Sequence, residues 1–143
     1  MAKYPVVVYG ASGYTGMLIM DWLIDQNIPF TAVARDAKRV KEMMAQRVVR
    51  LESATYEIVE AQNTVDSLVK AFKGAKVVCN TVGPFVNFGL VAVEAALKAA
   101  RDRADADRAR EAADRGATEA RLAGERDAER RFAAEQARQG VTV

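Results

Sequence analysis

The chain has 143 residues, half of them apolar, and a formal net charge of +2. These values suit one domain with a real core and exclude a strongly basic surface for nucleic acid. There is no histidine and only one cysteine, Cys79, so a Cys/His metal site, histidine acid–base chemistry and an internal disulfide are excluded. The start lacks the apolar stretch of a signal peptide, and no apolar run reaches the roughly 18–20 residues of a membrane span. We therefore expect a cytoplasmic protein with no membrane partner.

Residues 6–16, with the sequence VVVYGASGYTG, carry the strongest signal in the chain. The apolar run 6–9 predicts a buried parallel strand, and a helical pattern follows over 15–26. Between them, Gly10, Gly13 and Gly16 have the spacing that permits a tight turn, close approach of a pyrophosphate and close helix–strand packing. The phosphates would bind the N–H groups at the start of the helix. The segment predicts a nucleotide-binding loop, and turn glycines that serve only chain geometry are the alternative.

The helix expected over 15–26 carries many apolar side chains. We expect it to be buried on more than one side, because these side chains leave little polar face. They are Leu18, Ile19, Trp22, Leu23 and Ile24.

The second strand, expected over 30–34, ends at Arg35. A carboxylate at this position would suit the ribose 2′-hydroxyl of NAD, whereas an arginine suits the 2′-phosphate of NADP. Asp36 is expected to cap the following helix, over 37–46. Arg35, with Lys38 and Arg39 one turn later, therefore favours NADP over NAD, and a set of solvated surface charges is the alternative.

The pattern continues with a third strand over 55–59, a helix that Asn63 or Thr64 caps and that runs to Phe72, and a fourth strand over 76–80. The loop 81–85 (TVGPF) follows at the carboxyl end of that strand, where ligands bind in open α/β sheets. Cofactor contact and simple loop closure are both open for it. A fourth helix is marked by an apolar stripe at Leu90, Val93, Leu97 and Ala100.

Strands that alternate with helices predict an α/β, Rossmann-like, doubly wound parallel sheet with the strand order 3-2-1-4. A charged helical extension is expected after it. Residues 101–143 contain ten Arg and no Lys against ten acidic residues and predict one long helix or a helical hairpin, with breaks at Gly116 and Gly124. Two interpretations of this tail remain: it is an arm that binds a partner, or it is a solvated and partly frayed helix.

The segments VVYGASGYTG, VARD and NTVGPFVNFG resemble the amino-terminal NAD(P)-binding domain of saccharopine dehydrogenase-like oxidoreductases, over residues 4–100. The resemblance implies a Rossmann fold, NADP or NAD as hydride carrier, and a second domain for substrate and dimerisation. It carries cofactor contact over to these positions: Gly10, Ser12, Gly13, Tyr14, Thr15, Gly16, Arg35, Gly83 and Pro84.

The family would continue with a fifth strand after residue 100, whereas this chain continues as RDRADADRAR. We therefore expect two parts, a truncated NAD(P)-binding domain over 1–100 and an Ala/Arg/Glu-rich tail over 101–143. The fourth strand would then be a sheet edge with unpaired backbone groups. A homodimer through the strand 76–80 or through the C-terminal helix is expected, unless the tail covers that edge.

The sequence thus predicts the cofactor domain of an oxidoreductase, with a dinucleotide as its small-molecule partner. No residue is a convincing proton donor, so no catalytic residue and no metal ligand are assigned. A non-catalytic dinucleotide-sensing module and a folded fragment without activity are the alternatives.

Overall fold

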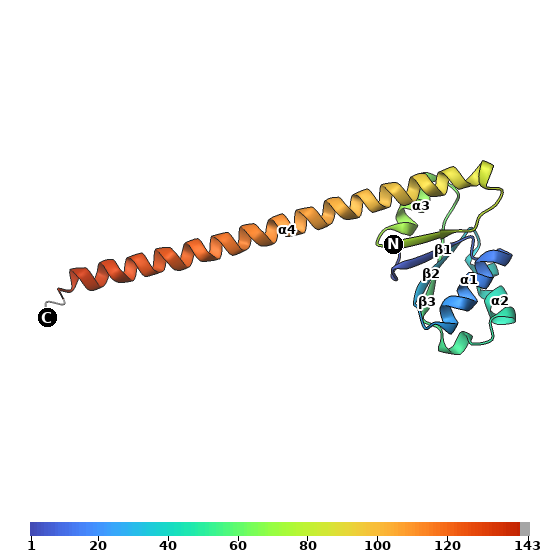
Figure 1. Cartoon of the computed structure of the whole chain (residues 1–143), viewed down its shortest axis with the longest axis horizontal. Coiled ribbons are helices and arrows are strands. Elements are labelled where there is room, and N and C mark those ends of the chain that lie inside the picture. Colours follow the sequence, from blue (N-terminus) through green and yellow to red (C-terminus); the bar gives the residue numbers. More distant parts are fainter. Residues whose placement is uncertain (141–143) are drawn as a thin grey trace. The chain divides into compact units, whose positions relative to one another are not determined.

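The computed structural model describes residues 1–140 and contains a four-stranded parallel sheet with the order β3-β2-β1-β4 (Figure 1). Val8 of the central strand β1 lies opposite Ala32 of β2 on one side and Cys79 of β4 on the other. The α/β class, the Rossmann-like topology and the strand order are therefore confirmed. The strands are β1 (Val6–Tyr9), β2 (Phe30–Ala34), β3 (Tyr56–Glu60) and β4 (Val77–Asn80).

Helices connect the strands and cover both faces of the sheet (Figure 1). The Asp36 side chain accepts a hydrogen bond from the N–H of Arg39 (3.0 Å) and caps α2, as expected. Thr64, rather than Asn63, caps α3 by accepting from the N–H of Ser67 (3.3 Å). The helices are α1 (Tyr14–Asp25), α2 (Ala37–Arg47), the short 3-10 helix η1 (Leu51–Ser53), α3 (Val65–Phe72) and α4 (Phe85–Arg138).

The sheet divides the core into two layers, because alternate strand residues point to opposite faces. Val8 belongs to a cluster with residues of α1 and α2, including Met20 and Met44. Val7 and Tyr9 belong to a second cluster, with residues of α3 and α4. Both faces of β1 and β2 are thus covered, which explains why these strands are apolar without alternation.

The expectation that α1 is buried on more than one side is wrong. Leu18 and Trp22 are 53% and 58% exposed, whereas Met20, Leu23 and Ile24 are buried. A helix that lies on one face of a sheet buries a single stripe, so apolar residues beyond that stripe stay in contact with water.

The apolar stripe that marks α4 is also on the wrong side of the helix for a core. Leu90, Val93 and Leu97 are 76%, 52% and 56% exposed. The buried positions are small residues, namely Gly89, Ala92, Ala95 and Ala99. Small side chains let the helix backbone approach the sheet closely, and this contact decides which face of α4 is inside.

The chain forms two compact units, Met1–Arg103 and the part from Ala104 onward. In the first unit, the Arg103 guanidinium donates a hydrogen bond to the Ala75 carbonyl oxygen (2.7 Å). In the second, α4 continues through Gly116 and Gly124, so the expected breaks are wrong. Strong helix formers around each glycine offset its cost of about 1 kcal/mol. No helix within residues 1–140 has the length and hydropathy needed to cross a bilayer.

Candidate functional site

The glycine loop between β1 and α1 is held in a conformation that excludes side chains. Gly10 has φ +90°, and a Cβ atom there would lie 2.5 Å from Thr81 Oγ1. A Cβ atom at Gly16 would overlap the carbonyl oxygen of Gly10, to which the Gly13 N–H donates a hydrogen bond (2.9 Å). Two of the three glycines are thus required by sterics, and the loop crosses the start of α1 at close range.

The start of α1 is left open to an anion. Its N-cap residue is Gly13, which has no side chain to satisfy the first N–H groups, and the first turn contains no acidic residue. These N–H groups and the positive end of the helix dipole together favour a phosphate.

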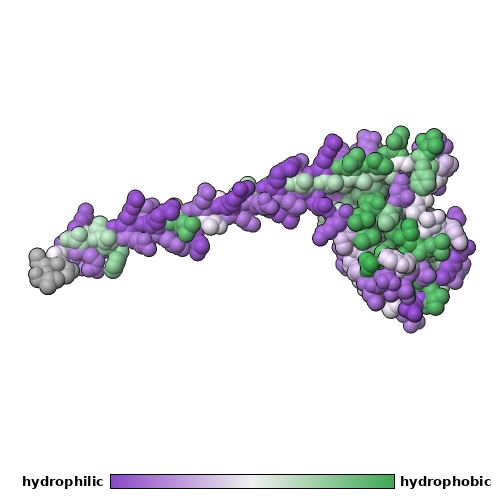
Figure 2. Space-filling view, in the orientation of Figure 1, coloured by the Kyte–Doolittle hydropathy of each residue, from purple (hydrophilic) through white to green (hydrophobic). Residues whose placement is uncertain are grey.

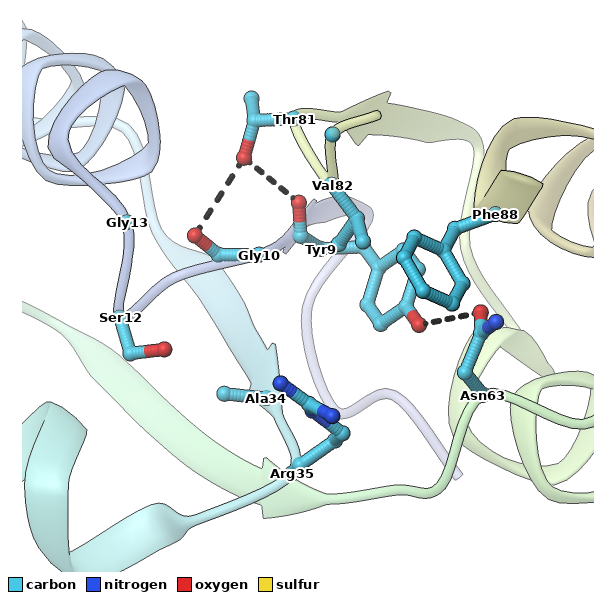
Figure 3. Close-up of a pocket in the computed structure, with 11 residues that line it drawn as sticks. Tyr9, Gly10, Ser12, Gly13, Ala34, Arg35, Asn63, Thr81, Val82 and Phe88 are labelled. Atoms are coloured by element: carbon cyan, nitrogen blue, oxygen red, sulfur yellow. Dashed lines mark hydrogen bonds between the residues drawn. The ribbon is translucent and has the colours of Figure 1, made fainter. Parts of the chain in front are cut away.

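A second loop is tied to the glycine loop by one hydroxyl group. Thr81, directly after β4, donates through Oγ1 to the carbonyl oxygens of Tyr9 (2.8 Å) and Gly10 (3.3 Å) (Figure 3). The Asn80 side chain accepts from the N–H of Val82 (3.1 Å). Thr81 and Val82 are therefore fixed beside the glycine loop, at the carboxyl edge of the sheet.

A cavity of about 230 Å³ opens between these loops. Figure 3 shows Arg35, from the end of β2, below the cavity and Ser12, from the glycine loop, at its left, while Val82 lies above and Phe88 at the right. The lining residues are Tyr9, Gly10, Ser12, Gly13, Ala34, Arg35, Asn63, Thr81, Val82, Gly83 and Phe88. The cavity thus combines backbone donors, one cation and apolar side chains, as a small-molecule site does.

Tyr9 connects the cavity to the core. Its ring packs edge-on against Phe72, with ring centroids 5.7 Å apart, and its hydroxyl donates to Asn63 Oδ1 (2.8 Å). Burial raises the pKa of the Tyr9 phenol, and the nearby Arg35 charge partly opposes the shift. The phenol therefore remains a donor at neutral pH and holds the Asn63 amide at the cavity wall.

The structure brings some of the nine predicted positions together and leaves others outside. Gly10, Ser12, Gly13, Arg35 and Gly83 line the cavity. The remaining positions, Tyr14, Thr15, Gly16 and Pro84, do not line it, and the Tyr14 side chain is 73% exposed. The first three belong to the opening turn of α1 and would reach a ligand only through their backbone.

Sequence reasoning missed several lining residues. Asn63 follows β3 at the same sheet edge as Arg35, so its position was a usable signal, although it was considered only as a helix cap. Tyr9 ends β1 and could have been found in the same way. Phe88 has no comparable signal, because its approach depends on how α4 begins. Within residues 1–140, no group of three metal-binding side chains is present.

Comparisons with known proteins agree on a dinucleotide-binding fold. A family model described as NAD(P)H-binding matches residues 10–124. A lipid droplet localized protein of Caenorhabditis elegans is 32% identical over an alignment of 105 residues, and the match covers 68% of this chain and 25% of that protein. A putative trans-acting enoyl reductase of Mycobacterium tuberculosis is 32% identical over 105 residues, 72% of this chain and 25% of its own length. The chain thus spans about a quarter of the length of the curated relatives it matches.

A solved structure gives the same fold. The yeast methylglyoxal/isovaleraldehyde reductase complexed with NADPH superposes with a TM-score of 0.50 at 21% sequence identity, over 66% of this chain and 32% of that one.

Proposed function

Since the chain belongs to the NAD(P)H-binding family, we propose that it is the cofactor-binding part of a reductase and that it binds NADPH in preference to NADH. Residues 1–100 form the binding domain in this proposal, and residues 101–143 are a helical extension. The pyrophosphate binds the Gly10–Gly16 loop, Arg35 faces the ribose 2′-phosphate, and the loop at Gly83 and Pro84 lies toward the nicotinamide.

One observation carries the proposal: the glycine loop leaves no room for side chains and exposes the start of α1. Gly10 and Gly16 have no space for a Cβ atom, and Gly13 leaves the first turn without a cap. A pyrophosphate fits such a site because its oxygens accept from backbone N–H groups. Ser12, which lines the cavity, adds a hydroxyl group beside Gly13.

The preference for NADPH rests on the groups around Arg35. The guanidinium lines the cavity, whereas the two nearest carboxylates in sequence and across the sheet are engaged elsewhere. Asp36 caps α2, and Glu60 accepts from the N–H of Ala37 (3.2 Å). A free carboxylate would favour the 2′-hydroxyl of NAD, so the arrangement favours a 2′-phosphate.

The reductase activity is proposed from the relatives. Bound NADPH supplies a hydride, and the chain's own residues bind and orient the dinucleotide and shield it from water. The names of the mycobacterial relatives support reduction of an enoyl group. The finer relation to saccharopine dehydrogenase-like oxidoreductases rests chiefly on the segment 80–89. Enoyl reduction and this finer relation are both proposals, and they concern a longer protein of which this domain would be one part.

Calorimetric titration of the purified chain with NADPH and NADH tests the proposal. We expect binding of both, tighter for NADPH. In Gly13→Val, binding of both is lost, because a branched side chain occupies the phosphate site. The control is Gly116→Val, which adds the same side chain where nothing lies within 4 Å. Absence of NADPH binding by the parent chain, or undiminished binding by Gly13→Val, would refute the proposal.

A further inference from the structure

The carbonyl oxygen of Gly10 is the point at which the glycine loop closes on itself. It accepts a hydrogen bond from the Gly13 N–H (2.9 Å), and it occupies the place that a Cβ atom at Gly16 would need. The N–H of Gly10 donates to the carbonyl oxygen of Val33 in β2 (2.9 Å). The direction of the Gly10 carbonyl group therefore sets the path of the loop from β1 into α1.

The closed loop leaves a set of main-chain donors unused. The N–H groups of Gly10, Ala11 and Gly13 all donate to carbonyl oxygens of the first unit. Within residues 1–140, four other N–H groups of the loop and of the first turn of α1 have no acceptor, and they belong to Ser12, Tyr14, Thr15 and Gly16. Free N–H groups at a helix start are donors for an anion. Their arrangement lasts only as long as the loop keeps its shape.

The side chain of Thr81 reaches the Gly10 carbonyl group from the neighbouring strand. Thr81 follows β4, and its N–H donates to the carbonyl oxygen of Tyr9 (2.9 Å), which continues the pairing of β4 with β1. Its hydroxyl reaches one residue further and contacts the carbonyl oxygens of both Tyr9 (2.8 Å) and Gly10 (3.3 Å) (Figure 3). The main chain of Thr81 thus keeps the strand register, while the hydroxyl contacts the glycine loop.

The space beside Gly10 is filled by this hydroxyl. A Cβ atom at Gly10 would lie 2.5 Å from Thr81 Oγ1 and 2.9 Å from Cγ2 of Val82. The missing side chain of the glycine is therefore what admits the hydroxyl to the main chain of the loop. Among residues 1–140, the acceptors of the Thr81 hydroxyl are the two carbonyl oxygens named above. Its contribution is thus confined to this contact.

We propose that Thr81 is a positioning residue for the phosphate site. Its hydroxyl fixes the Gly10 carbonyl group, and through the bond to Gly13 it keeps the four free N–H groups in the arrangement that accepts a pyrophosphate. The inference rests on the proposed function, because it concerns the same loop. The pyrophosphate is common to NADPH and NADH, so loss of the hydroxyl weakens the binding of both by one factor. Loss of Arg35, in contrast, changes the ratio between them.

Calorimetric titration of the full chain with NADPH and NADH is the first test. We expect Thr81→Ala and Thr81→Val to raise both dissociation constants equally, by about three- to tenfold, which is the effect of one hydrogen bond. Thr81→Ser keeps the hydroxyl and the parental constants. The control is Thr118→Val, which removes a hydroxyl that donates to the carbonyl oxygen of Asp114 (2.9 Å). Thr118 belongs to the second unit, where hydrophilic residues dominate the surface (Figure 2).

Amide hydrogen exchange of the unliganded chain, followed by NMR, is the second test and needs no dinucleotide. The Gly13 amide reports the bond to the Gly10 carbonyl oxygen. We expect Thr81→Ala to speed its exchange on the order of tenfold while the buried residues Val8 and Met20 keep their parental rates, because the loop opens locally. Thr81→Ser leaves the rate at Gly13 unchanged. Uniform acceleration of all three amides would reveal only a less stable domain and would overturn the role proposed for Thr81.

The two tests separate the two proposals. A parent chain that binds neither dinucleotide would refute the proposed function, and the exchange of the Gly13 amide would still decide whether Thr81 fixes the loop. Parental binding by both Thr81→Ala and Thr81→Val would overturn the role of Thr81 alone. So would a Thr81→Ser variant that binds as weakly as Thr81→Ala, since the hydroxyl would then not be the group that matters.

Discussion

The side chain of Tyr9 belongs both to the hydrophobic core and to the wall of the cavity. Its ring is buried against Phe72, while its hydroxyl holds Asn63 at the cavity wall. Because the last residue of a central strand faces both the core and the ligand edge, a change there affects stability and binding together. Tyr9 therefore gives a measurable link between the two.

We predict that Tyr9→Phe lowers the free energy of unfolding at neutral pH by about 1 kcal/mol, through loss of the hydrogen bond to Asn63. The raised pKa of the phenol adds a pH dependence. Above about pH 10 the phenol loses its proton in the unfolded state but keeps it in the native state. The contribution of Tyr9 to the free energy of unfolding is therefore complete below about pH 10 and falls as the pH rises toward the native pKa. Urea unfolding between pH 7 and 11 should show this fall in the parent and a shallower one in Tyr9→Phe. Parallel curves would contradict the assignment.

Arg35 is expected to decide between the two dinucleotides. In Arg35→Ser, we predict that the dissociation constant for NADPH rises about 10- to 100-fold, because a charge-assisted contact is worth roughly 1.5–3 kcal/mol, while that for NADH changes little. Titration of both ligands into one preparation measures the ratio. Arg47→Ser, in the last turn of α2, is the matched control. Equal losses for NADPH and NADH would show that Arg35 does not read the phosphate.

Among single residues, the positions of the glycine loop and of Arg35 beside the cavity could be predicted from the sequence. Each lies directly after a strand that the sequence already predicts. Thr81 lies in a loop for which the sequence left cofactor contact and loop closure open, and its bonds to Tyr9 and Gly10 depend on strand register. Phe88 could not be predicted, since only packing of α4 brings it to the cavity. Cofactor contact by the predicted residues stays a prediction.

Elements were predicted well where the pattern was local. The four strands and the caps at Asp36 and Thr64 follow from apolar runs and capping chemistry, and the structure has them within one or two residues. The apolar stripe correctly marked a helix at α4, but it did not identify the buried face, because close packing on the sheet selects the alanines. Periodicity identifies a helix, but tertiary contact decides which face is inside.

The alanine face of α4 gives a test of this packing. Ala95 is fully buried, so we predict that Ala95→Leu overpacks the layer between α4 and the sheet and lowers the free energy of unfolding by about 1–3 kcal/mol. Lys98→Leu, which adds a leucine at an exposed position of the same helix, should change it by less than about 0.5 kcal/mol. Thermal unfolding of both variants makes the comparison. Equal effects would mean that the alanine face is not tightly packed.

For the whole molecule, the difference between the two units lies in what stabilises them. Residues up to Arg103 share two buried clusters, whereas every residue from 104 to 140 is exposed. An exposed helix is stabilised only by its own hydrogen bonds and by pairs such as Arg121–Glu125, and such pairs contribute roughly 0.2–0.5 kcal/mol each. Its local opening should therefore be far easier than that of the first unit.

We predict that brief trypsin treatment cleaves first at arginines after Arg103, and that a product close to residues 1–103 persists. Mass spectrometry of the early products identifies the sites. If lysines of the first unit, such as Lys38 or Lys70, were cut as early as Arg115, the two units would be equally stable. NADPH should slow only the later cleavages, since the ligand contacts we propose all lie in the first unit.

The phosphate site that we propose consists almost entirely of main-chain N–H groups, whereas the contact proposed to select the dinucleotide is a single guanidinium. Pyrophosphate binding and the preference for one coenzyme would therefore depend on substitutions at different positions of the chain. Pyrophosphate binding would depend on a few glycine positions, of which Gly10 and Gly16 have no space for a Cβ atom, and would tolerate most substitutions elsewhere in the chain. The coenzyme preference, in contrast, rests chiefly on Arg35 in this proposal. Lineages of this domain are accordingly expected to exchange NADPH for NADH repeatedly, through substitutions at one position, while keeping the loop unchanged.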